Sequence, residues 1–134
     1  MPFLDELAAR LVAQGVGTVG SNIFLGSRAI IPPGPGPYLS LRETGGTGPT
    51  RIHNRNGAHT QRPTAHVLVR AATYPAARKM AQDAYTALDG VFNTTLINTF
   101  YQSITARQEL TDLGLDADTR VMISFNVDAE KAPG

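Results

Sequence analysis

The sequence predicts an α+β fold in which two helices pack on one face of a mainly antiparallel sheet. Two segments carry apolar residues at helical spacing, and the segments that alternate present only one strongly apolar face. Antiparallel sheets that are covered on one side show this one-sided pattern. The expected order of elements is α-β-β-β-α-β-β-β.

Both helices have recognisable ends. The first is predicted at about residues 2–14, with Pro2 in its first turn and Gly15 as its stop. The second begins at Thr73-Tyr74-Pro75 and ends at Gly90. Their apolar stripes are Leu4, Leu7, Ala8, Leu11 and Val12 in the first helix, and Ala77, Met80, Ala81, Ala84, Tyr85 and Leu88 in the second.

Six segments are predicted as strands from their alternation and their flanking turn residues. The last has the clearest pattern, with Val121, Ile123, Phe125 and Val127 facing inward. Two others are expected to form a bent hairpin around Asn98-Thr99. The six segments are residues 21–27, 38–43, 65–71, 94–97, 100–105 and 120–127.

The remaining chain is expected to connect these elements within one domain that covers residues 1–134. The stretch IIPPGPGP at residues 30–37 is predicted to be a rigid exposed connection because proline cannot donate to a ladder. From about residue 44 to 63 only Ile52 and Ala58 are apolar apart from glycine and proline, so a long polar loop is expected. Residues 128–134 are polar and are expected to form a frayed tail.

Composition excludes several classes of function. The chain has no cysteine, which removes disulfides, thiol nucleophiles and cysteine-ligated metals. Its net charge of +1 gives no global attraction to nucleic acid or to an anionic membrane. No apolar run approaches the roughly 20 residues that span a bilayer, and Asp5 and Glu6 stand where a signal peptide would carry basic residues. A soluble protein of the cytoplasm is expected.

Two glycine-rich motifs lack the neighbouring elements or residues that nucleotide or phosphate binding requires. Residues 15–20 match G-x-G-x-x-G, but they follow a predicted helix and precede a strand, the reverse of the order that dinucleotide binding requires. The stretch TGGTG at residues 44–48 lacks the Gly-Lys-Ser/Thr ending of a phosphate-binding loop. Neither motif is interpreted as a cofactor site, and no cofactor is predicted.

Candidate metal ligands and nucleophiles show no signature either. The histidines at 53, 59 and 66 lack the i, i+4 helical spacing that brings two imidazoles to one metal. Asp112, Asp116 and Asp118 lack the terminal glutamate of a calcium loop and are expected to form a polar turn. No nucleophile elbow is present. No catalytic or metal-binding residue is therefore assigned.

The polar segment at 44–63 is the one candidate functional region. It contains Arg51, His53, Arg55, His59 and Arg62 and no acidic residue. Arginine pairs with phosphate through two hydrogen bonds, so contact with a nucleic-acid backbone is one interpretation. Because aromatic residues are not interleaved, such contact would be weak, backbone-only and salt-sensitive. A solvated mobile loop is the alternative interpretation.

Nearly the whole chain resembles the tail-terminator type of minor capsid and tail-completion proteins of long-tailed phages. The resemblance is carried by MPFLDELAARLVAQGVG, residues 22–25, GPYLSLRETGGTGPTRIHN, QRPTAHVLVRAATYPAARKMAQDAYTAL and VMISFNV. It is most specific in ETGGTGP and in the block from Gln61-Arg62-Pro63 to Tyr74-Pro75-Ala76-Ala77.

This resemblance implies a non-enzymatic virion protein that forms a ring, typically of six copies, on the tail tube. The ring ends tube polymerisation and joins the tail to the head. The implied partners are further copies of the chain, the tail-tube protein, a head-completion neck protein, and genomic DNA that passes through the lumen without sequence specificity. The implied location is the neck of the virion, after assembly in the host cytoplasm, with no membrane partner. The five residues of the polar segment would face the lumen or a partner.

Three alternatives stay open at this point. One is a head-completion protein, of the stopper or adaptor kind, because neck proteins are easily confused by sequence. A small soluble enzyme would need a pocket with clustered acids or bases. A nucleic-acid-binding regulator would bind DNA as a monomer with a steep salt dependence.

Overall fold

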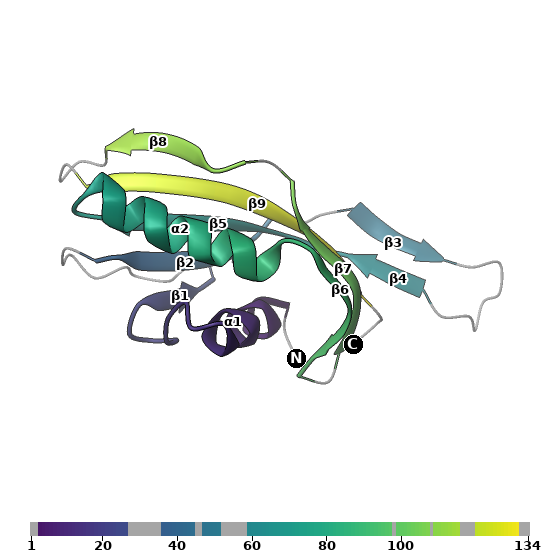
Figure 1. Ribbon diagram of the computed structural model, residues 1–134. Helices are drawn as coiled ribbons and strands as arrows, with labels where there is room; N and C mark the ends of the chain where they lie inside the picture. Colours follow the sequence, from purple (N-terminus) through teal and green to yellow (C-terminus); the bar gives the residue numbers. More distant parts are fainter. Residues whose placement is uncertain are drawn as a thin grey trace.

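The computed structural model describes residues 3–26, 36–44, 47–51, 59–97, 99–107, 109–115 and 120–131, with backbone alone for 47–51, 59 and 60. The elements are α1 (Phe3–Ala13), β1 (Ile23–Leu25), β2 (Tyr38–Glu43), β3 (Thr47–Arg51), β4 (His59–Arg62), β5 (Thr64–Ala71), α2 (Tyr74–Leu88), β6 (Val91–Leu96), β7 (Thr99–Ala106), β8 (Thr111–Leu115) and β9 (Val121–Lys131). Figure 1 shows α2 lying along the sheet, with α1 below it.

Both helices begin and end where the sequence predicts. Asp5 and Glu6 lie in the first turn of α1, where the positive end of the helix dipole favours them. Just beyond this helix, Gly15 has a φ of +77°, a conformation that glycine adopts without strain. Pro75 lies in the first turn of α2. The glycine-rich stretch after α1 is a turn, in which the Thr18 N–H donates to Asn22 Oδ1 at 2.7 Å.

Strand β9 is the central strand of the sheet and pairs with four others. Along one edge it pairs with β5 over residues 121–128 and then with β4 at Lys131. Along the other edge it pairs with β8 over residues 121–124 and with β7 over residues 127–131. These pairs are all antiparallel, as are β2–β5, β3–β4 and β6–β7, whereas β1 lies parallel to β2.

The hydrophobic core lies between the helices and the inner face of the sheet. Strands β2, β5 and β9 each bury alternate residues, and the small side chains of Ala77, Ala81 and Ala84 let α2 lie close to them. The largest fully buried apolar side chains are Phe125, Leu7, Leu11, Ile23, Leu39, Leu41, Leu88, Ile104 and Ile123, together with Tyr101. The α+β class, with two helices on a mainly antiparallel sheet, is therefore confirmed.

The segment at 44–63, expected to be one long loop, includes two strands. It contains β3 and β4, which pair antiparallel from Thr47↔Arg62 to Arg51↔His59. They continue the β2–β5 pair beyond the main sheet as a two-stranded extension (Figure 1). The prediction relied on apolar alternation, but ladder hydrogen bonds are made by the backbone, so polar residues can pair without that pattern. Residues 45, 46 and 52–58 of the expected loop lie outside the described residues.

Two further expectations near the C-terminus are corrected. The last strand continues to Lys131 instead of fraying from residue 128, because Ala129 and Lys131 continue the inward alternation and are buried. The expected polar turn around Asp112 is strand β8, in which every residue is exposed, so the strand buries no apolar residue that would mark it. Asp116, Asp118, residues 132–134 and most of the proline-rich connection (residues 30–35) lie outside the described residues.

Candidate assembly surface

The outer face of the sheet, opposite the helices, is mostly polar, with Leu68 and Met122 as apolar residues on it. Strand β5 turns His66, Leu68 and Arg70 outward, between the inward Val67 and Val69. Strand β9 does the same with alternate residues from Met122 to Glu130. Alternation therefore divides each strand between an apolar inner side that holds the fold and an outer side that is mostly polar, on which Ser124 is buried.

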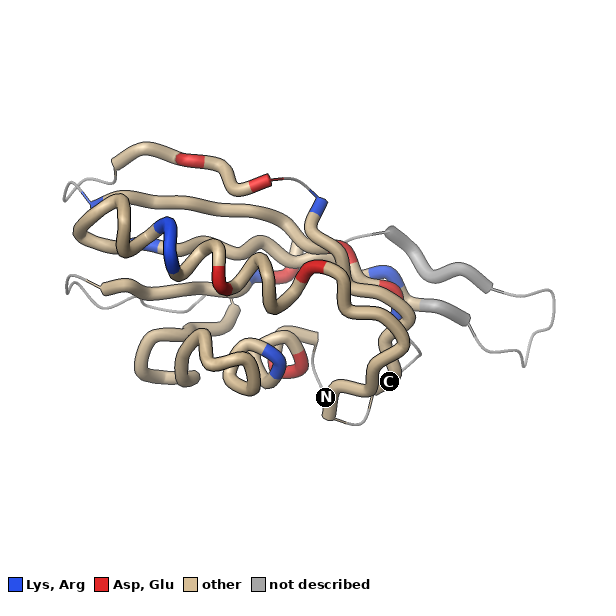
Figure 2. Tube along the Cα trace, viewed as in Figure 1, with Lys and Arg blue, Asp and Glu red and all other residues tan. Residues whose placement is uncertain are grey.

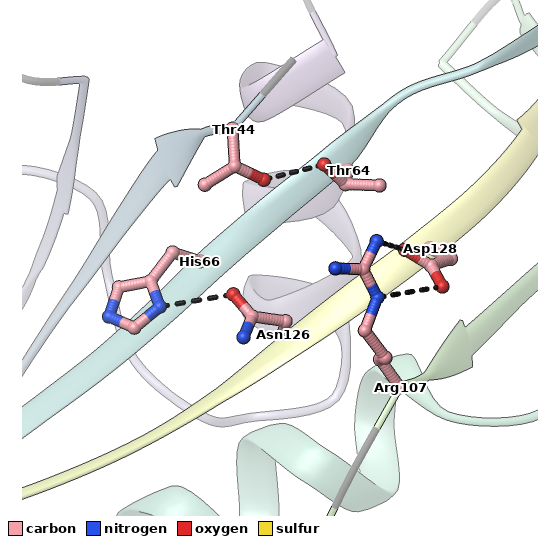
Figure 3. Close-up of polar contacts among 6 residues, drawn as sticks. All are labelled: Thr44, Thr64, His66, Arg107, Asn126 and Asp128. Carbon is pink, nitrogen blue, oxygen red and sulfur yellow. Dashed lines mark hydrogen bonds and ion pairs between the residues drawn. The ribbon is translucent and has the colours of Figure 1, made fainter. Parts of the chain in front are cut away.

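Cross-strand hydrogen bonds order this face near the end of β2. His66 on β5 and Asn126 on β9 are register partners, and His66 Nδ1 lies 3.1 Å from Asn126 Oδ1. The hydroxyl groups of Thr44 and Thr64 also bond to each other, which ties the end of β2 to the start of β5 (Figure 3). These contacts hold the point at which the β3–β4 extension leaves the sheet.

A two-bond ion pair lies beside them. Arg107 Nη2 is 2.6 Å from Asp128 Oδ1, and Arg107 Nε is 3.2 Å from Asp128 Oδ2 (Figure 3). The hydrogen bond to Asp128, supported by its negative charge, raises the pKa of the Arg107 guanidinium above its ordinary value. The Arg107 backbone N–H also donates to Asn126 O at 2.8 Å. The residue thus fixes the chain as it leaves β7.

A shallow pocket of about 280 Å³ lies among the ends of β4, β5, β7 and β9. It is lined by Arg62, Thr64, Ser103, Thr105, Arg107, Asp128, Ala129 and Glu130. Both of its arginines face a carboxylate, since Arg62 Nε lies 3.8 Å from Glu130 Oε1. The charges in the pocket balance, and its groups are suited to hydrogen bonding with a polar partner surface. Figure 2 shows acidic and basic residues close together in this region.

The structure brings together few of the five predicted site residues. Arg51 and His59 are register partners in the extension, although only their backbones are described. Arg62 ends β4, is exposed and contacts Glu130. His53 and Arg55 lie outside the described residues. The prediction that these residues contact a lumen or a partner therefore stays a prediction.

A buried polar network that no sequence pattern indicates lies between α1 and the sheet. Glu6 on α1 is fully buried, and its Oε1 accepts a hydrogen bond from the Tyr101 hydroxyl at 2.7 Å. Lys131 Nζ lies 3.5 Å from the same oxygen and 5.8 Å from the centre of the Phe3 ring. Burial, with help from the bond to Glu6, raises the pKa of Tyr101 well above its ordinary range. The network fastens α1 to the ends of β7 and β9.

The described part of the chain holds no candidate metal site and no candidate membrane-spanning helix. Among these residues, no group of three or more His, Asp or Glu side chains is placed to hold a metal ion. Within the same ranges, no helix is long and apolar enough to cross a membrane.

Comparison with known proteins identifies the family of the chain. The chain matches the family described as "Bacteriophage tail terminator protein" over residues 10–132. No curated protein shows significant sequence similarity to it. Its fold is similar to that of a chain in a solved structure titled "Virion of native gene transfer agent (GTA) particle", with a TM-score of 0.53 and 19% identity over 95% of this chain and 84% of that chain. Because the family match covers most of the sequence, this chain belongs to the bacteriophage tail terminator family and is a structural protein of the phage tail.

Proposed function

We propose that this protein forms a ring at the head-proximal end of the phage tail, where it ends tube polymerisation and joins the tail to the head. The family match over residues 10–132 carries this proposal. The likeness of the fold to a chain of a gene transfer agent virion supports it. We propose that it acts without catalysis, in the neck of the virion, after assembly in the host cytoplasm.

The geometry suits a subunit that must contact copies of itself. In a closed ring each copy uses two different surfaces, one toward each neighbour. The described chain has distinct ends of this kind, with β8 at one and the β3–β4 extension at the other (Figure 1). A ring of six such subunits would contact the tail-tube protein on one side and a head-completion protein on the other.

The arginine-rich segment is proposed to contact a partner or the passing DNA in the assembled neck. Neutralising Arg51, Arg55 and Arg62 together with glutamine should leave the unfolding transition of the isolated protein unchanged. The reason is that the one described side chain, Arg62, is exposed and makes only a long ion pair. The same variant should lower the yield of infectious particles. Normal titres would contradict the proposed role of this segment.

Native mass spectrometry over a range of protein concentrations, followed by incubation with purified tail tubes, tests the whole proposal. A closed assembly near six copies, or a monomer that becomes a ring on tube ends and stops their growth, is the expected result. Binding to isolated heads, with no effect on tube growth, would contradict it and indicate a head-completion protein. A monomer that binds DNA but neither structure would indicate a regulator.

A further inference from the structure

The last residue of β9 joins the base of the β3–β4 extension to the first helix. The backbone of Lys131 pairs with Gln61 of β4 along one edge and with Tyr101 of β7 along the other. Its side chain turns to the inner face, where it is buried and its Nζ lies 3.5 Å from Glu6 Oε1 of α1. One residue therefore contacts the extension, a strand of the main sheet and α1.

The extension has few other attachments to the main sheet. A two-stranded hairpin is only marginally stable by itself in water. Within the described residues, β3 pairs with β4 alone, and β4 pairs with the main sheet only at Gln61↔Lys131. Two contacts support this pair, since the Ala129 N–H donates to Pro63 O at 3.0 Å and Glu130 forms the long ion pair described above. All of these contacts come from the last three residues of β9.

The end of β9 is in turn held by buried charges. The carboxylate of Glu6 is balanced by Lys131, and it accepts a hydrogen bond from the Tyr101 hydroxyl at 2.7 Å. Its second oxygen, Oε2, is buried without a hydrogen-bond partner among the described residues. Removing one member of a buried ion pair is strongly destabilising, because the other charge then stays buried and uncompensated. These three residues, here called the Glu6 network, therefore decide whether the end of β9 stays in place.

We propose that the Glu6 network couples α1 to the β3–β4 extension, so that the end of β9 and the extension detach together when the network is broken. Residues 121–128 of β9 are held by continuous pairing with β5 and stay in place. Segments with few buried contacts open locally before the whole domain unfolds. Such coupling is reciprocal, so a partner that holds the extension also strengthens the hold on α1. This inference concerns a single chain and does not rest on the proposed function.

Hydrogen exchange of the isolated protein tests the coupling. Lys131→Met keeps an unbranched side chain but removes its charge. We expect the backbone amides of β3, β4 and residues 129–131 to exchange about tenfold faster or more, while those of β5 and residues 121–128 keep their wild-type rates.

A second variant changes the other end of the network. Glu6→Gln is a more conservative substitution, and it lies on α1 instead of on the strand that holds the extension. It should accelerate exchange of the same amides, which shows the coupling even if Lys131→Met does not fold. The double variant Glu6→Gln/Lys131→Met buries no charge at this site and should recover part of the protection.

Two controls separate coupling from a general loss of stability. Glu130→Gln changes the neighbouring residue on the outer face, which makes only a half-exposed ion pair, so it should alter exchange of the extension by less than about twofold. Ile123→Val trims a buried residue in the first half of β9. It should lower the stability of the whole domain without accelerating the extension selectively.

Three results would overturn the inference. Faster exchange confined to α1 and residues 129–131 would mean that the extension is held independently of the network. Faster exchange in all strands alike would mean that the network stabilises the domain as a whole. Extension amides that already exchange at the rate of an unstructured chain in the wild-type protein would show that the end of β9 does not hold them. None of these results bears on ring formation, which the experiment with tail tubes tests separately.

Discussion

The two faces of the sheet differ in what holds them together. The inner face is a continuous apolar layer under two helices, with Phe125, Val67 and Leu39 fully buried. The outer face is held by pairs of polar groups, such as Arg107 with Asp128 and His66 with Asn126, that remain partly in water. Stability should therefore depend more on the inner face than on the outer face.

Truncation of the inner face should have the largest effect. Phe125→Ala removes a buried ring that packs edge-on against Tyr85, with ring centres 5.4 Å apart. We expect the free energy of unfolding to fall by about 4 kcal/mol. Leu68→Ala, a truncation on the outer face of β5, should cost less than half as much in the same urea titration. Equal losses would contradict the difference between the faces.

Breaking the buried ion pair should have the second-largest effect on the free energy of unfolding. Lys131→Met leaves Glu6 buried with only the Tyr101 hydroxyl as a described partner, which should cost about 3 kcal/mol. Adding Glu6→Gln should recover part of that loss, because no charge then stays buried. Chemical unfolding of the two single variants and the double variant measures this coupling. A wild-type value for Lys131→Met would mean that the end of β9 is frayed after all.

The contribution of the same network to stability should fall at alkaline pH because Tyr101 ionises. In the unfolded chain this hydroxyl ionises near the ordinary tyrosine pKa of 10.0, whereas burial and the bond to Glu6 keep its pKa higher in the folded chain. Its contribution to stability is therefore complete below pH 10 and falls as pH rises above it, by up to about 1.4 kcal/mol per pH unit. Tyr101→Phe should be less stable at pH 7 and should lose less stability between pH 9 and 11. Parallel slopes for the two proteins would contradict this assignment.

The smallest effect should come from the outer face. Arg107 and Asp128 are 53% and 43% exposed, so Arg107→Ala should cost less than about 1 kcal/mol despite the short bonds. The difference from wild type should shrink further in 1 M salt, because exposed charges are screened. A loss above 2 kcal/mol that persists in salt would mean that this pair belongs to the core.

The inner face could be predicted from the sequence because its signal is periodic. Both helices, β2, β5 and the apolar side of β9 follow from the spacing of their buried residues. Strands β3 and β4 could not be predicted because their sequences contain no apolar stripe, and β8 could not because all of its residues are exposed. All three are held by backbone pairing. The role of Glu6 was hidden because an acidic residue in a first helical turn is ordinary, and only the tertiary fold brings Tyr101 and Lys131 to it.

The candidate surface was predictable only in part. The concentration of arginine at 44–63 is visible in the sequence, but the carboxylate that faces Arg62 lies on β9, 68 residues further along the chain. The exposure of Leu113 and Leu115 depends on β8 being an edge strand, which local sequence does not encode.

Electron microscopy of tails made without this protein tests the central claim most directly. If it ends tube polymerisation, particles assembled in its absence should have tails of uncontrolled, excessive length that are not joined to heads, and adding the purified protein early should restore a uniform length. Tails of normal, uniform length in its absence, whether joined to heads or not, would contradict a terminating role.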